Sequence, residues 1–534
     1  MKWTIKSLIL VVFFSASVSW AGQQPNPVIA TGASDVWSSA SYSSPAGITY
    51  YVSSSGDDAN SGVAESSPLK TIQKAIDYGK TSYNSGLNVK IAIAAGIYKE
   101  PLYLNYNNNQ TNVISIERWG SGDVEIVGYR LQTGWTLYSG SIYQRQWYKN
   151  WGWISNPWSP SASEIDGTAM LRREFIEYDG TMLEEVFSIA DITAGSFFID
   201  EADNKVYMHT PDGGAPASGK SFVAEYPTSD MSGFQVAYTS NVQLKNLQIK
   251  YYACALQHGN LRINDCDNIR LDNIRVLKGA GSGINLVRND DITLYRCFVN
   301  DNGQLGGSFK LCSNLLVDTC NFERNNVRGS WINFSGWYLG GCKIGDCSIV
   351  AVRDSIFRNN KTNGLWFDVG CTDVYVDNVL CKNNMLEGGN AGLWVEISDG
   401  PTLVENSTFE GSNYGVYISN ANNVFVTGCA LQENDDIQLA IRNVASRMPL
   451  ITNTWFQDNT VEKSTSGGYL VGTPQSIDSL YYTGALVSGE FGYNAYYHVD
   501  ADNQWEDDVS STTNFTGWKA NTGLDAVGST FTRL

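Results

Sequence analysis

Short segments in which apolar and polar residues alternate recur through the middle of the chain. Each begins with a polar or turn-forming residue and continues with β-branched or other apolar residues at every second position. Successive segments are separated by 27, 23, 23, 35, 24, 28, 22 and 25 residues. An alternation with a period of two predicts β-strands, and the regular spacing predicts an internal repeat. The segments start at Asn241, Asn268, Asp291, Asn314, Ile349, Asp373, Pro401, Asn423 and Met448.

The length of the repeat suits one coil of a parallel β-helix, in which short strands joined by turns stack at about 4.8 Å. The pairs Asn325-Asn326, Asn359-Asn360 and Asn383-Asn384 follow several strands. Asn tolerates a left-handed backbone, and stacked amides can hydrogen-bond along the axis. A leucine-rich repeat is the alternative, but the pattern lacks a helical half. The interval of 35 predicts one coil with an inserted loop, around residues 336–346.

The segments outside the repeat define the rest of the organisation. Residues 68–76 predict a short amphipathic helix, which we expect to cap the first coil within residues 22–104. Residues 105–230 break the repeat and carry hairpin signals, such as 197–200 and 205–208, so we expect a β-rich insertion there. Repeats with the site then fill residues 231–465. Residues 466–534 are irregular, and we expect them to pack along the coils or cap the far end.

The first 21 residues read as a secretory signal peptide. Lys2 and Lys6 precede an apolar stretch from Ser7 to Val18, and Ser19-Trp20-Ala21 offers small residues for cleavage. No later segment is apolar for long enough to span a membrane. We therefore expect a secreted protein, extracellular or periplasmic, with no membrane span.

Composition and charge narrow the partners. The 51 Gly, 29 Tyr and 16 Trp residues, with only 17% charged residues, favour β-structure. The net charge of −18 argues against a nucleic-acid partner and mildly against a strongly anionic substrate, although a local basic cleft could override the average. All ten cysteines lie between Cys254 and Cys429. Export permits disulfides, and the alternative is that several are small apolar residues stacked in the core.

Two consecutive coils end in nearly the same strand, Gly364-Leu-Trp-Phe-Asp368 and Gly392-Leu-Trp-Val-Glu396, 28 residues apart. If Leu365 and Phe367 point inward, then Trp366 and Asp368 point outward, and the second strand repeats this arrangement. Asp368 then lies beside Glu396. Carboxyl groups about 5–5.5 Å apart have the geometry of a retaining glycosidase, and their mutual repulsion raises one pKa. The alternative is a turn former and a solvated surface acid.

Several residues are candidates for substrate binding on the same face. Outward aromatic side chains offer flat surfaces on which sugar rings stack, or they form ordinary core if another segment covers them. Lys343 lies one coil earlier and could orient the substrate or form a salt bridge with Asp368. Arg328 and Asn333 are weaker candidates. The aromatic candidates are Trp331, Trp366, Trp394 and Tyr417.

The sequence predicts no cofactor. It contains no Ser/His/Asp arrangement and no His or Cys spacing typical of a metal site. Asp57-Asp58 and Asp290-Asp291 are weak candidates for binding Ca²⁺, because acidic residues in solenoid turns are usually solvated.

At these residues the chain resembles secreted right-handed β-helix glycoside hydrolases, including a bacterial β-xylosidase family. The resemblance rests on Gly364 to Asp368, Glu396-Ile-Ser-Asp-Gly-Pro401 and Val404-Glu-Asn406. It implies an all-β, right-handed parallel β-helix of the pectate-lyase-like kind with a sandwich-like insertion. It also implies that Asp368 is the nucleophile and Glu396 the acid/base. The segment after Asp368, Val369-Gly370-Cys371, differs from the family's pattern.

Three functions are compatible with these features. The first is a retaining glycoside hydrolase that cleaves a polysaccharide or oligosaccharide. The second is a polysaccharide lyase, which needs a uronic acid substrate, a basic residue such as Lys343 and usually a cation. The third is a non-catalytic carbohydrate-binding surface protein, in which loss of either carboxyl group would leave function unchanged. The oligomeric state and the glycan do not follow from the sequence.

Overall fold

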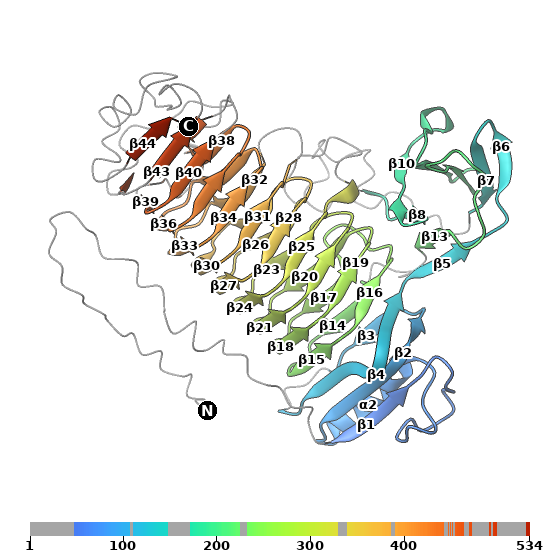
Figure 1. Ribbon diagram of the computed structural model, residues 1–534. Coiled ribbons are helices and arrows are strands. Elements are labelled where there is room, and N and C mark those ends of the chain that lie inside the picture. The colour runs from blue at the N-terminus through green and yellow to red at the C-terminus, as the bar shows by residue number, and fades with distance from the viewer. Residues whose placement is uncertain are drawn as a thin grey trace.

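The protein is a long stack of short parallel strands with a smaller β-rich body beside its N-terminal end (Figure 1). The structure is a computed structural model, which describes residues 47–106, 111–147, 171–224, 232–328, 339–385, 390–442, 447, 449, 451, 454–463, 469–472, 491–492, 495–498 and 530–533. The predicted signal peptide and most of residues 466–534 lie outside these ranges.

Each repeat forms one coil that contributes strands to two long sheets. The 11-stranded sheet takes one strand from each coil, and successive coils pair in parallel. Its strands are β3 (Leu102–Leu104), β14 (Phe234–Ala237), β17 (Gly259–Asn264), β20 (Ser282–Val287), β23 (Gly307–Lys310), β26 (Cys342–Gly345), β29 (Leu365–Asp368), β32 (Ala391–Glu396), β35 (Tyr414–Ser419), β38 (Ile437–Arg442) and β41 (Tyr469–Gly472).

The 24-stranded sheet takes two strands from most coils, also in parallel. Its strands are β1 (Ile48–Val52), β2 (Val89–Tyr98), β4 (Ile114–Val127), β15 (Val242–Lys245), β16 (Gln248–Lys250), β18 (Asp267–Asp272), β19 (Arg275–Leu277), β21 (Asp290–Tyr295), β22 (Phe298–Asn300), β24 (Ser313–Asp318), β25 (Asn321–Glu323), β27 (Ser348–Arg353), β28 (Ile356–Arg358), β30 (Thr372–Asp377), β31 (Leu380–Lys382), β33 (Thr402–Glu405), β34 (Thr408–Glu410), β36 (Val424–Thr427), β37 (Ala430–Gln432), β39 (Thr454–Gln457), β40 (Thr460–Lys463), β42 (Phe491–Gly492), β43 (Ala495–His498) and β44 (Thr530–Arg533).

Alternating side chains fill one continuous core between the two sheets. Leu365 and Phe367 of β29 are fully buried in it, as are Leu393 and Val395 of β32. Because side chains alternate along a strand, the residues between them face outward. The inward and outward assignment predicted for these two strands is confirmed.

Asn side chains stack inside the turns and join successive coils. Asn325 donates to the Oδ1 of Asn360 at 3.1 Å, and Asn360 donates to the Oδ1 of Asn384 at 2.9 Å. These amides approach the coil start so closely that a Cβ on Gly364 would lie 2.7 Å from the Nδ2 of Asn384. Their partners in the predicted pairs, Asn326, Asn359 and Asn383, adopt positive φ. The expected roles of the Asn pairs are confirmed.

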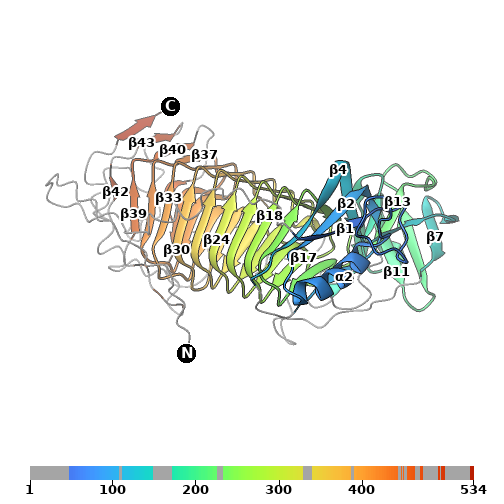
Figure 2. The ribbon, with the colours of Figure 1, turned by 90° about the horizontal axis from the view of Figure 1, so that it is seen from below.

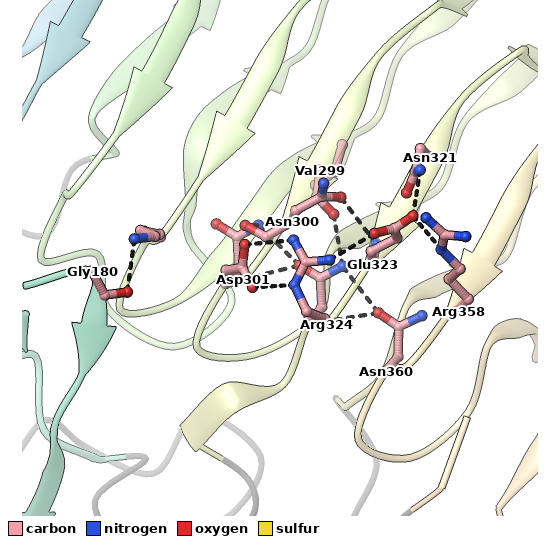
Figure 3. A network of polar contacts seen from close by, with 12 residues as sticks. Gly180, Val299, Asn300, Asp301, Asn321, Glu323, Arg324, Arg358 and Asn360 are labelled. Atoms are coloured by element: carbon pink, nitrogen blue, oxygen red, sulfur yellow. Dashed lines mark hydrogen bonds and ion pairs between the residues drawn. The ribbon is translucent and has the colours of Figure 1, made fainter. Parts of the chain in front are cut away.

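Ion pairs also join coils along the outer turns (Figure 3). Arg324 lies 2.7 Å from Asp301 of the preceding coil, and Arg358 pairs with Glu323 in the same way. The arginines of both pairs are about half exposed, so each pair contributes little and the ladder adds to the stability of the coils without dominating it.

The ten cysteines are all buried free thiols. Cys312 and Cys347 stack in consecutive coils, with the backbone N–H of Cys312 donating to the Cys347 sulfur at 3.3 Å. The interpretation of the cysteines as small core residues therefore holds, and they form no disulfides.

Helix α2 (Ile72–Asn84) packs on the first strands of the stack (Figure 2) and buries Ile72, Ala75 and Ile76 in the main core. It starts later than the predicted segment because acidic side chains fix its N-terminus. Asp58 accepts from the N–H groups of Lys70 and Thr71 at 2.9 Å, and Glu100 accepts from Ile72 and Gln73.

Two small sheets form the insertion. The five-stranded sheet contains β6 (Thr136–Ser139), β7 (Ile142–Gln146), β10 (Glu184–Val186), β11 (Ser196–Asp200) and β12 (Lys205–His209); a 3₁₀ turn, η2 (Ile189–Asp191), follows β10. The four-stranded sheet contains β5 (Tyr129–Gln132), β8 (Ile176–Tyr178), β9 (Thr181–Met182) and β13 (Ser221–Ala224). The antiparallel β11–β12 pair matches the predicted hairpin. The strand β4 pairs with β2 and β15, so the insertion begins after Val127 and not at residue 105.

Candidate active site

Four neighbouring strands of the 11-stranded sheet, β26, β29, β32 and β35, carry the predicted site residues on their outer face. The backbone register aligns Lys343 with Trp366, Trp366 with Trp394, and Trp394 with Tyr417. These residues form one column along the axis. The extra residues of the 35-residue interval fall between Arg328 and Leu339, so Lys343 lies on a strand and not in the predicted loop.

The two acids lie two positions further along their strands. Asp368 ends β29 opposite Gly345, and Glu396 ends β32 opposite Ser419. The same phase on adjacent strands places the two α-carbons about 5 Å apart. This is the spacing from which two carboxyl groups can act on opposite sides of one glycosidic bond.

Lys343 connects the column to the acids. Its Nζ lies 2.7 Å from the Oδ2 of Asp368 and 3.6 Å from the centre of the Trp366 ring. Burial lowers the pKa of Lys343, while the charges of Asp368 and Glu396 oppose that shift. The salt bridge that the sequence offered as one of two roles for Lys343 is present.

Glu396 has the electrostatics of a proton donor. It is 5% exposed, and Arg447 Nη1 donates to its Oε1. Burial, and then the negative charge of Asp368, raise the pKa of Glu396 to about 7, with the charges of Arg447 and Lys343 acting in the opposite direction. Glu396 therefore keeps its proton to a higher pH than an ordinary glutamic acid.

The aromatic side chains pack on one another. Trp366 and Trp394 stack with their ring centres 4.5 Å apart and an interplanar angle of 4°, and Tyr417 continues the stack at 5.0 Å. Trp394 is stacked on both faces, and Trp366 contacts Trp394 and the Lys343 ammonium, so these two rings are not open platforms for sugar. The indole N–H groups of Trp366 and Trp394 are buried and have no hydrogen-bond partner within the described part of the chain.

Not every predicted residue joins this group. Arg328 is 2% exposed, donates to the carbonyl of Ala280 and lies 3.5 Å from Glu185 of the insertion, so it connects the insertion to the coils. Trp331 and Asn333 lie outside the described residues. Asp290 and Asp291 form an exposed acidic group with Asp267 on the 24-stranded sheet, and Ca²⁺ binding there stays a prediction.

Two arginines near the acids were not predicted. Arg442 follows Ser419 in the register and is a hydrogen-bond partner of Tyr417. Continuing the Asp368–Glu396 column by two more coils would have identified it. Arg447 lies in a turn after β38, outside the repeat, and no sequence signal connects it to Glu396.

Comparison with known proteins places this architecture among β-helices. The family described as "Right handed beta helix region" matches residues 232–403 and 374–473. The handedness and fold class predicted from the sequence are thus confirmed.

The chain is similar to several solved structures at low identity, and with one of those named here the TM-score exceeds 0.5. The structure described as the complex of XylC with xylose is 14% identical, covers 84% of each chain and has a TM-score of 0.54. A chain described as a glycoside hydrolase is 11% identical, covers 83% of this chain and 98% of its own length, and has a TM-score of 0.41. A lacto-N-biosidase from Eubacterium ramulus is 11% identical, covers 84% of this chain and 64% of its own, with a TM-score of 0.37. No curated protein matches the sequence.

These results give a right-handed parallel β-helix with an outward carboxyl pair on adjacent coils. Within the described residues, no helix has the length and apolar character needed to cross a membrane.

Proposed function

We propose that the protein is a secreted retaining glycoside hydrolase acting on a polysaccharide or oligosaccharide. The observation that carries this proposal is the pairing of Asp368 with a buried Glu396 whose pKa is raised to about 7 on the neighbouring strand. One group is then available as an acid at neutral pH beside a carboxylate.

The mechanism uses these two side chains and no cofactor. An Asp368 carboxylate oxygen forms a bond to the anomeric carbon as the glycosidic C–O bond breaks, and Glu396 gives its proton to the leaving oxygen. Glu396, now ionised, takes a proton from water, whose oxygen displaces Asp368 from the sugar. Lys343 holds Asp368 in place through its 2.7 Å ion pair.

The test compares the wild type with Asp368→Asn and Glu396→Gln on a glycan panel that includes xylo-oligosaccharides and uronic-acid-bearing oligosaccharides. Each substitution should lower kcat/KM by about 10²–10⁴-fold, because acid and base catalysis contributes that much. Product anomers followed by NMR should show retained configuration. Arg275→Gln, on the 24-stranded sheet, is a charge-changing control that should leave kcat/KM unchanged.

A polysaccharide lyase is the second candidate, because burial lowers the pKa of Lys343 and so favours its use as a base. A lyase produces a new double bond that absorbs ultraviolet light. Absorbing products that persist in Asp368→Asn would replace the hydrolase proposal with this one. Binding without any cleavage, unchanged by both substitutions, would favour a non-catalytic carbohydrate-binding protein.

A further inference from the structure

The outward column that contains Lys343 and Trp366 continues towards the N-terminal end of the 11-stranded sheet. The register aligns Ser308 with Lys343, Asn285 with Ser308, and Arg262 with Asn285. Gln235 and Tyr103 extend the column over the first two strands. One face of the stack thus carries a continuous file of side chains leading to the acid pair, in which Asn285 and Ser308 are buried and Arg262 is partly buried.

Arg262 is the unusual member of this file. Its side chain is partly buried, and its Nε is buried without a hydrogen-bond partner. Throughout the described ranges, no hydrogen bond or ion pair to its guanidinium is found. The nearby Asp265 pairs with Arg288 instead, accepting two hydrogen bonds from its guanidinium at 2.6 and 2.9 Å. Burial and the charge of Arg288 lower the pKa of Arg262.

A guanidinium that is removed from water and has no acidic partner lowers the stability of the fold, unless a ligand supplies the missing hydrogen bonds and negative charge. The neighbouring Asn285 supports this interpretation. It is 3% exposed, and its Nδ2 donates to Ser308 at 3.3 Å, but its Oδ1 is buried without a partner. An unsatisfied donor and an unsatisfied acceptor therefore belong to register-aligned residues of adjacent strands, which suits the binding of a group with both acidic and hydroxyl oxygens.

Further cations follow this face towards the acids. Lys310, two strands from Arg262, is about half exposed and lies 3.8 Å from Asp346, which is a long ion pair. Lys343 comes next, and Arg442 and Arg447 lie beyond Glu396. Lys343 and Arg447 are paired with the two acids, so the positive excess on this face comes from Arg262, Lys310 and Arg442, in a chain with a net charge of −18.

We propose that this face binds an acidic polysaccharide and that Arg262 anchors one of its uronic-acid carboxylates, five strands from Glu396. Five strand spacings correspond to about 24 Å, so the site recognises a chain of several sugars. The proposal rests on the proposed function in that the bound chain runs to the same acid pair, and it names the substrate class.

The test is calorimetric titration of the full-length chain in a Glu396→Gln background, which separates binding from turnover. The ligands are homo-oligouronates from disaccharide to octasaccharide and neutral oligosaccharides of the same lengths. Arg262→Gln removes the anchor, Arg262→Lys keeps its charge, and Arg275→Gln removes an exposed charge from the other sheet. Thermal unfolding of each variant verifies that it is folded.

Arg262→Gln should weaken the binding of long oligouronates by about tenfold or more, since a hydrogen-bonded charge is lost. Arg262→Lys should lose less, and Arg275→Gln should stay within about twofold. The effect should disappear for oligomers too short to reach Arg262, and added salt should weaken the wild-type affinity.

Equal affinity of wild type and Arg262→Gln for every oligouronate, or an equal loss for neutral oligosaccharides, would overturn the proposal. The two proposals fail separately: if Asp368→Asn and Glu396→Gln still cleave glycans, the hydrolase proposal fails, and KM values of the Arg262 variants for long oligouronates then replace the titration as the readout of the ligand class. If Arg262→Gln does not fold, a loss of affinity in Arg262→Lys that is confined to long oligouronates supports the site, and unchanged affinity, or an equal loss for neutral oligosaccharides, contradicts it.

Discussion

At the scale of single residues, Glu396 determines how activity depends on pH. A general acid must carry its proton, so kcat/KM should fall as the pH rises through about 7, the pKa of this group in the free protein. Arg447→Gln removes a positive charge that lowers the pKa of Glu396, so the fall should move to higher pH. The measurement is the pH dependence of kcat/KM for both proteins, and coincident profiles would contradict the role of Arg447.

The same raised pKa makes Glu396 a destabilising residue at neutral pH. Glu396 binds its proton more tightly in the folded protein than in the unfolded chain. Glu396 therefore does not destabilise the fold below about pH 4.5, where both states are protonated, and it lowers the free energy of unfolding as the pH rises through about 7. Glu396→Gln should therefore raise the free energy of unfolding at pH 8 by roughly 1–3 kcal/mol and have little effect at pH 4. Denaturant titrations at the two pH values measure this difference. A rise in the free energy of unfolding at pH 4 and not at pH 8 would contradict the raised pKa of Glu396.

The sequence could reveal only those site residues that occupy a regular position in the repeat. Asp368 and Glu396 share a phase, so alternation and coil length were enough to bring them together. The self-stacking of Trp366 on Trp394 follows from the same register, but whether a ring faces a neighbour or a ligand depends on side-chain rotamers that the pattern does not encode. Arg447 approaches from a turn, where no period applies.

At the scale of elements, the Asn ladder fixes each coil on the next. Asn360 is 1% exposed, and its Nδ2 donates to the carbonyl of Phe322 and to Asn384, while its Oδ1 accepts from Asn325. Asn360→Ala leaves these buried groups unpaired and should lower the free energy of unfolding by about 3 kcal/mol or more. Urea denaturation followed by circular dichroism measures the loss.

The neighbouring Asn359 is the matched control. It is exposed and has a φ of 56°, which Gly adopts without strain. Asn359→Gly should change stability by less than about 1 kcal/mol. A similar loss in both variants would mean that the exposed Asn359 side chain contributes as much as the buried amide ladder.

Element boundaries were harder to predict than element types. The strand β4 has 14 residues and carries both strands of its coil in one continuous element, although Gly120-Ser-Gly-Asp123 within it reads as a turn and both glycines have positive φ. The start of α2 depends on Asp58 and Glu100, which lie 13 and 28 residues away from the N–H groups they accept from. Such contacts are set by the tertiary structure and are invisible to a local pattern.

At the scale of the whole molecule, a buried ionic cluster attaches the insertion to the stack. Arg172 lies 2.9 Å from Glu174 and 3.5 Å from Glu185, and Glu185 lies 3.5 Å from Arg328. Arg328→Leu leaves buried acids without this partner and should cost about 3–5 kcal/mol. Arg324→Leu, which removes an exposed ion pair four residues earlier, should cost less than about 1 kcal/mol. Chemical denaturation together with limited proteolysis of the insertion measures both.

Equal destabilisation by the two arginine substitutions would contradict this assignment. So would an insertion that resists proteolysis in Arg328→Leu as well as it does in the wild type.

The stacking of coils also makes the reaction sensitive to one particular joint. Asp368 belongs to one coil and Glu396 to the next, so the acid pair exists only while that single interface is closed. In a molecule whose coils contact mainly their neighbours, such interfaces open separately before the whole structure melts. Enzymatic activity therefore reports whether the interface between β29 and β32 is closed. On heating, activity should be lost at a lower temperature than the β-structure of the whole β-helix.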